Sequence, residues 1–224
     1  MRHRKRQQGF SFIEILIVMG IISVLVGGVI VAINMWTEKG PVFATKNTLT
    51  KVKALVENWK QTYEMYPPGD VTRIADVAGA GKKAQAPGND TNAGIEALYQ
   101  ALHWPGFKGT ELTQDEVSNN DDDKLRAAIG KASADLMEIR DAWENPFVYF
   151  NRDDYGKYAD GASYYNGLGD SVEPKPWKNK DGTFVNPESF QIYSMGPDGE
   201  PNTADDITPW PRSDEEEEPE VEED

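Results

Sequence analysis

The sequence predicts an α+β fold, in which a long N-terminal helix packs on a small antiparallel sheet. An apolar segment near the N-terminus leads into a stretch whose apolar residues recur every three or four positions. That period is typical of a helix with one face on a hydrophobic core. In the second half of the chain, short aromatic-rich stretches lie between turn residues, a pattern that is typical of strands.

The N-terminal segment predicts a membrane helix. No charged residue occurs from Ile15 to Ile33. At about 1.5 Å per residue, a helix of that length matches a hydrocarbon core of about 30 Å. The preceding residues 1–9 contain four basic side chains, namely Arg2, Arg4, Lys5 and Arg6. Basic flanks remain in the cytoplasm, so the bulk of the chain is expected to be exported.

This N-terminus differs from an ordinary secretory signal, whose cleavage site follows the apolar region. Here Gly9 precedes the apolar region, with Phe10 after it and Glu14 at the start of the helix. The arrangement resembles the signal of the type IV pilin and pseudopilin superfamily. The resemblance implies that a prepilin peptidase cuts after Gly9 and methylates the new N-terminal Phe10.

Glu14 is unusual because a carboxylate in hydrocarbon costs about 2.5–3.5 kcal/mol on insertion scales. The resemblance implies a partner, the amine of Phe10 on a neighbouring subunit, which would set the register of a filament. The alternative is a plain anchor in which Glu14 lies at the headgroup boundary.

Composition limits the rest of the chain. Residues beyond the anchor suffice for one exported domain with its own core. The chain has no cysteine, so no disulfide can stabilise that domain. Loss of the leader would take 4 of the 23 basic residues and leave 19 against 38 acidic ones, a formal charge of about −19. Such a surface repels nucleic acid and anionic lipid, which argues against a nucleic-acid partner.

The second helical stretch, residues 44–63, is amphipathic. It should continue the apolar helix, which Gly40-Pro41 is expected to interrupt. It should end before Tyr66-Pro67, because proline disfavours helical geometry in the preceding residue. Its apolar positions are Leu49, Val52, Val56, Trp59 and Tyr63.

The middle of the chain alternates polar segments with short helices. Residues 69–91 read as a surface loop and residues 106–123 as a polar insert. Between them we expect a helix capped by Asn92, with Ile95, Leu98 and Leu102 on one face. A further helix is expected from about Lys124 to Ile139, with Leu125, Ala128, Ile129, Ala132 and Leu136 on one side.

Strands are expected after this. Asn145-Pro146 is a turn sequence, and the aromatic residues from Phe147 to Phe150 favour a strand. Further strands are predicted at 162–165 and 190–195.

The segment S-M-G-P-D-G-E-P-N-T-A-D-D-I-T-P-W, residues 194–210, carries a candidate calcium site. Asp198, Asp205 and Asp206 share this Gly/Pro-rich loop, and calcium binds six to eight such oxygen ligands in irregular geometry. The loop resembles the C-terminal calcium loop of major pseudopilins. The resemblance implies Asp198 and Asp205 as side-chain ligands and Met195 as a backbone ligand, with Asp206 as an extra candidate. The alternative is a solvated acidic turn.

Enzymatic chemistry finds little support. His103 is the one histidine beyond the leader, which leaves the usual nucleophile–histidine pairs without support, and we expect it to be a packing or surface residue. The C-terminal residues 213–224 contain nine acidic side chains in twelve and are expected to be disordered and solvated.

Together these features resemble the G-type major pseudopilin of type II secretion. The resemblance implies a homopolymer formed through N-terminal helices, with prepilin peptidase, minor pseudopilins and an inner-membrane assembly platform as partners. The subunit would be stored in the bacterial inner membrane, with its C-terminal domain in the periplasm. The expected division is a leader at 1–9, an assembly helix at 10–36, an amphipathic helix at 37–66, a globular head at 67–212 and a tail at 213–224.

Two alternatives remain open at this point. A type IV pilin for adhesion or motility would have the same N-terminus, although many such pilins close their C-terminal region with a disulfide. A membrane-tethered binding protein or enzyme would use the apolar helix merely as an anchor.

Overall fold

A computed structural model describes residues 12–77, 89–107, 109, 112–125 and 134–212, and describes no side chain at 14–15, 27–38, 75, 77, 125 or 134. The chain divides into two compact units, residues 1–41 and 42–224. Within the described part of the chain, no helix combines the length and apolar character that crossing a membrane requires. The leader and the acidic tail predicted from sequence lie outside the described residues.

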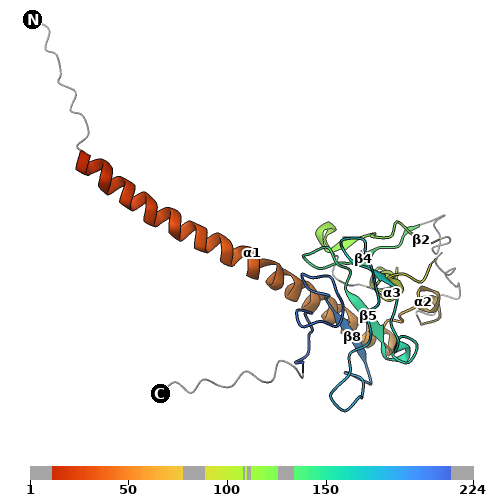
Figure 1. The fold of residues 1–224 in the computed structure, drawn as a ribbon. Coiled ribbons are helices and arrows are strands. Elements are labelled where there is room, and N and C mark those ends of the chain that lie inside the picture. Colours follow the sequence, from red (N-terminus) through yellow and green to blue (C-terminus); the bar gives the residue numbers. More distant parts are fainter. Residues whose placement is uncertain (1–11, 78–88, 108, 110–111, 126–133, 213–224) are drawn as a thin grey trace, which may run out of the picture. The chain divides into compact units, whose positions relative to one another are not determined.

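The first helix, α1, spans Phe12–Tyr63 (Figure 1). Pro41 lies inside it, so the predicted interruption at Gly40-Pro41 is wrong. Proline removes one backbone hydrogen bond and crowds the preceding turn, but its fixed φ is helical, and the turns on either side keep their own bonds. As predicted, the helix ends before Tyr66-Pro67.

The second half of α1 presents one buried face, which confirms the amphipathic pattern. Leu49, Val52, Val56 and Trp59 are at most 2 % exposed. The Trp59 ring lies 5.3 Å from Phe107, centroid to centroid, and thus joins α1 to the head.

The central pair of strands is antiparallel and entirely buried. β5 (Val148–Asn151) pairs with β8 (Phe190–Tyr193), with Tyr149 opposite Ile192. Both strands were expected from their aromatic residues. A shorter pair, β6 (Tyr164–Tyr165) and β7 (Ser171–Val172), coincides with the third predicted strand.

The helix α3 (Ala93–Leu102) packs on β5 and on β4 (Glu138–Ile139), and Figure 1 shows these elements side by side. Ile95, Leu98 and Leu102 are buried, as the sequence predicted. Gly94 permits the close approach, because a Cβ atom at this position would overlap the Tyr149 carbonyl oxygen.

Two predictions for the middle of the chain need correction. The expected loop at 69–91 contains a helix, α2 (Val71–Val77). The expected helix at 124–139 is wrong at both ends: β2 (Lys124–Leu125) pairs with β3 (Ala134–Asp135), and β4 pairs with β1 (Val117–Ser118). Residues 126–133 lie outside the described part. The spacing of apolar residues does not reveal that β4 pairs with β1 and packs on α3. These tertiary contacts outweigh local preference. Two 3-10 turns complete the fold, Gln114–Glu116 and Arg152–Asp154.

Candidate metal centre

Three acidic side chains that are far apart in sequence meet inside the head. Glu96 lies in the first turn of α3, Asp121 in the turn after β1, and Glu138 at the start of β4. One carboxylate oxygen from each lies within 4.8 Å of the others. The pairing of β1 with β4 places Ser118 opposite Glu138 and so brings the Asp121 turn close to α3.

Asparagine side chains and one backbone amide orient two of these carboxylates. Asn92 donates from Nδ2 to Glu138 Oε1 over 3.0 Å, and the backbone N–H of Asn120 donates to the same carboxylate over 3.1–3.2 Å. Asn89 Nδ2 donates to Asp121 Oδ2 over 3.3 Å. The carboxylates of Glu96 and Asp123 accept no hydrogen bond of this kind.

Asn92 corrects one detail of the sequence interpretation. It occupies the N-cap position of α3, but in left-handed geometry with φ of 54°, and its side chain makes no capping hydrogen bond. The amide is engaged elsewhere, because Nδ2 bonds Glu138 and Oδ1 accepts from the Tyr165 N–H over 3.1 Å. The Asn92 side chain therefore bonds the acidic cluster and Tyr165 instead of capping α3.

Several carboxylate oxygens of the cluster are buried without a hydrogen-bond partner. Both oxygens of Glu96 are in this state, as are Oδ1 of Asp121 and both oxygens of Asp123. Glu96 and Glu138 are 0 % exposed. An unpartnered buried polar atom costs on the order of 1–3 kcal/mol, more when it is charged.

Burial and like charge raise the pKa of every member. Burial, together with the nearby carboxylates of Asp123, Asp121 and Glu138, raises the pKa of Glu96 to about 10. Burial likewise raises the pKa of Glu138 to about 7 and that of Asp123 to about 6. Glu96, Asp121 and Glu138 could therefore hold a metal, whose positive charge would offset this repulsion.

Sequence reasoning missed this site. The run Asn119-Asn120-Asp121-Asp122-Asp123 is a visible acidic turn, but we interpreted residues 106–123 as a polar insert of unknown role. Glu96 carries no local signal that sets it apart from other polar residues of a short helix, and Glu138 lies in β4 rather than in the predicted helix.

The loop predicted to bind calcium, residues 194–210, is closed at its base. Ser194 and Ile207 exchange backbone hydrogen bonds of 3.0 Å in both directions. The backbone N–H of Asp198 donates to Asp205 Oδ2 over 3.2 Å, which brings these two predicted ligands together. Gly196 is required here, because its φ is +68° and a Cβ atom would lie 2.5 Å from the Asp205 carbonyl oxygen.

The other two predicted ligands lie deeper. Met195 is fully buried. Asp206 is 4 % exposed, and its Oδ2 accepts from the Asn202 N–H over 2.8 Å. Burial raises the pKa of Asp206 to about 7. Among the described residues, this loop does not form a group of three acidic side chains within ion-sharing distance, whereas the cluster around Glu96 does.

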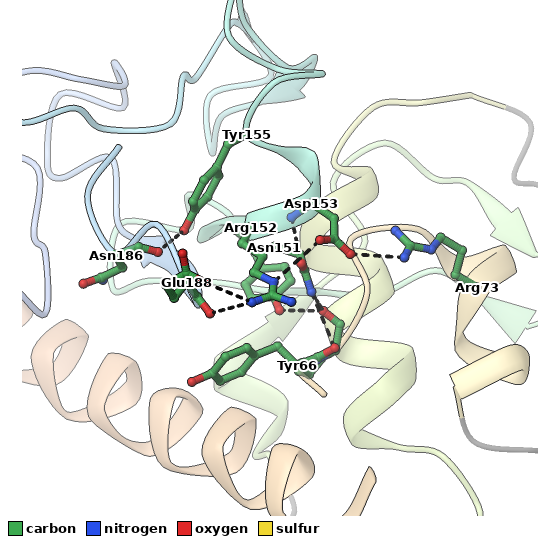
Figure 2. Close-up of polar contacts among 10 residues, drawn as sticks. Tyr66, Arg73, Asn151, Arg152, Asp153, Tyr155, Asn186 and Glu188 are labelled. Atoms are coloured by element: carbon green, nitrogen blue, oxygen red, sulfur yellow. Dashed lines mark hydrogen bonds and ion pairs between the residues drawn. The ribbon is translucent and has the colours of Figure 1, made fainter. Parts of the chain in front are cut away.

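A polar cleft of about 160 Å³ lies where the chain leaves α1. Figure 2 shows the polar contacts of several residues that line it. Arg152 contacts Asp153 at 3.6 Å and Glu188 at 3.3 Å, and Arg73 contacts Asp153 at 3.3 Å. Beneath them, Asn151 Nδ2 donates to the Pro67 carbonyl over 2.8 Å. These charged groups pair with one another. The hydrogen bond from Asn151 attaches the segment after α1 to β5.

His103 is exposed and stacks on Tyr99, with 4.0 Å between the ring centroids. Its Nδ1 lies 2.9 Å from the Tyr99 carbonyl oxygen. The prediction of a surface residue is therefore confirmed. Gly9 and Phe10 lie outside the described residues, as does the side chain of Glu14, so their predicted roles stay predictions.

Comparison with known proteins identifies the N-terminus. Residues 4–30 match the prokaryotic N-terminal methylation motif. No curated protein and no solved structure matches the chain. The motif places the chain among type IV pilin- and pseudopilin-like proteins, which are typically non-enzymatic structural subunits. It implies processing by a prepilin peptidase, a membrane-anchored exported protein and pilus-like assembly.

Proposed function

We propose that this pilin-like subunit is the major pseudopilin of a type II secretion system and polymerises into a periplasmic pseudopilus that drives exoprotein export. Cleavage after Gly9 exposes Phe10 for methylation, and the carboxylate of Glu14 pairs with the Phe10 amine of the next subunit. The functional division is a leader at 1–9, an assembly helix at 10–36, an amphipathic helix at 37–66, a head at 67–212 and an acidic tail at 213–224.

The observation that carries this proposal is the architecture of the 194–210 loop. The chain has no cysteine, and the loop is instead closed by the backbone pairing of Ser194 with Ile207. Asp198 and Asp205 meet above that base. We propose that they bind calcium with the Met195 carbonyl, and that Asp206 supports the loop as an additional acidic ligand. Calcium then does for this loop what a disulfide does in many adhesive pilins.

The second candidate is a type IV pilin for adhesion or motility, favoured by the same methylation motif at residues 4–30. The motif alone does not distinguish the two classes, because both assemble through the same kind of N-terminal helix. A tethered enzyme is disfavoured, because His103 is the one histidine beyond the leader and the chain has no cysteine for a Cys–His pair.

Deletion of the gene separates the candidates. The extracellular proteome and the surface motility of the deletion strain are compared with those of the parent strain, with the gene restored from a plasmid as the control. Exoproteins retained in the periplasm, with motility unchanged, support the pseudopilin. Unchanged secretion with lost motility or adhesion assigns the protein to the type IV pilins instead.

A further inference from the structure

We infer that Glu96, Asp121 and Glu138 form a structural calcium site, with Asp123 beside them, that ties the insert at 106–123 to α3 and β4. This site is separate from the loop at 194–210, and the inference does not rest on the secretion role. The observation that points to a ligand is Glu96, which is fully buried with both carboxylate oxygens unpartnered.

Protonation alone accounts poorly for this arrangement. A proton removes one charge, but the carboxylic acid still needs a hydrogen-bond acceptor, and Oδ1 of Asp121 and both oxygens of Asp123 would still lack partners. A cation satisfies several oxygens at once and also offsets their mutual repulsion. The three ligand oxygens already lie within 4.8 Å of one another, so little rearrangement is required.

The donor set favours calcium among the common cations. Every proposed ligand atom is a carboxylate oxygen, whereas zinc and copper sites are usually built with histidine or cysteine. Calcium accepts irregular geometry and six to eight oxygens, while magnesium demands a near-ideal octahedron and retains several waters. Three carboxylates on a turn, a helix and a strand give an irregular arrangement.

Calcium would join parts of the head that are far apart in the sequence. The insert at 106–123 is attached to α1 by the ion pair of Lys51 with Glu116, at 2.7 Å. At its other end, the backbone N–H of Asn120 bonds Glu138. An ion bound to Asp121, Glu96 and Glu138 adds a link between the insert and α3.

Calcium binding to the full-length protein in detergent micelles tests the inference. The protein is stripped with chelator and titrated calorimetrically with Ca²⁺, and its Tm is followed in parallel. The double variant Asp198→Asn, Asp205→Asn serves as the background, because it removes the proposed ligands of the 194–210 loop. In this background we expect about one equivalent of bound calcium, and a Tm rise of roughly 3–6 °C at ten times the Kd.

Glu96→Gln and Asp121→Asn, each made in that background, should abolish both the calcium binding and the Tm rise. Glu96→Gln should also keep the Tm in chelator, because glutamine has nearly the same shape and carries no charge. A misfolded variant would lower that Tm instead, and Asp121→Asn then provides the deciding measurement. Asp122→Asn is the matched control: it removes the same charge from the exposed position of the same turn, whose φ of +55° asparagine tolerates.

Each remaining outcome has a distinct meaning. Absence of calcium binding in the background variant, or unchanged binding in Glu96→Gln, would overturn the inference. An equal Tm rise with Mg²⁺ would overturn the assignment to calcium. If the background variant binds as much calcium as the wild type, the loop at 194–210 is not a site, and the cluster around Glu96 stands alone.

Discussion

Asp141 shows how a single buried carboxylate connects two parts of the head. Its Oδ1 accepts from the Trp143 and Asn145 N–H groups, and its Oδ2 accepts from the Ser194 hydroxyl over 2.6 Å. Ser194 also pairs with Ile207 at the base of the 194–210 loop. Burial raises the pKa of Asp141 to about 6 even though these hydrogen bonds lower it. Its neutral form is therefore favoured in the folded protein relative to the unfolded chain.

This shift predicts a pH-dependent effect of Asp141→Asn. The folded pKa lies above the unfolded value of about 3.9, so the stabilising contribution of the protonated form is full below that value and is lost as the pH rises to about 6. At about 1.4 kcal/mol per pKa unit, the free energy of unfolding of the wild type should fall by a few kcal/mol relative to the variant between pH 4 and 7.

Urea denaturation of both proteins at several pH values measures this difference. Asp160→Asn is the control, since Asp160 is exposed. A stability difference between wild type and Asp141→Asn that does not change with pH would show that burial does not raise this pKa.

At the scale of elements, α1 provides the clearest test of packing. Trp59 is 0 % exposed and contacts Phe107 of the head. Trp59→Ala should cost about 3–5 kcal/mol of stability, because it removes a large buried ring and leaves a cavity. Lys53→Ala on the exposed face of α1 should change stability by no more than about 0.5 kcal/mol. Chemical denaturation of both variants, monitored by far-ultraviolet circular dichroism rather than by tryptophan fluorescence, measures the two effects. Equal effects would contradict the packing.

Elements with a strong local pattern were predicted well. The buried face of α1 and the strands β5 and β8 follow from apolar or aromatic residues that are close in sequence. The residues from 124 to 139 were predicted poorly, because β2 pairs with β3 within this stretch and β4 pairs with β1, which precedes it. A two-residue strand carries almost no periodic signal, so only its pairing identifies it.

At the scale of the whole molecule, pilin-type processing predicts one particular N-terminus. The methylation motif covers residues 4–30, and the proposed cleavage follows Gly9. Mass spectrometry of the protein from membranes should find a mature chain that begins with methylated Phe10. A chain that still begins at Met1, or one cut beyond residue 30, would exclude this processing.

Assembly predicts a separate role for Glu14. Glu14→Ala should leave cleavage intact but strongly reduce filament formation, because the amine of the neighbouring Phe10 loses its partner. Glu64→Ala, which removes an exposed carboxylate just beyond α1, is the matched control. Shear fractionation and immunoblotting compare the filaments, and normal filaments from Glu14→Ala would refute the pairing.

The sequence by itself determined the membrane-targeted N-terminus, the amphipathic half of α1, the main strands and the acidic loop at 194–210. Each of these is a pattern of neighbouring residues, and chain connectivity alone keeps its members together. Only the tertiary structure decided that Glu96, Asp121 and Glu138 meet, because their contact depends on β1 pairing with β4 and on α3 packing against β4. Long-range packing creates this acidic cluster, and no local sequence pattern encodes it.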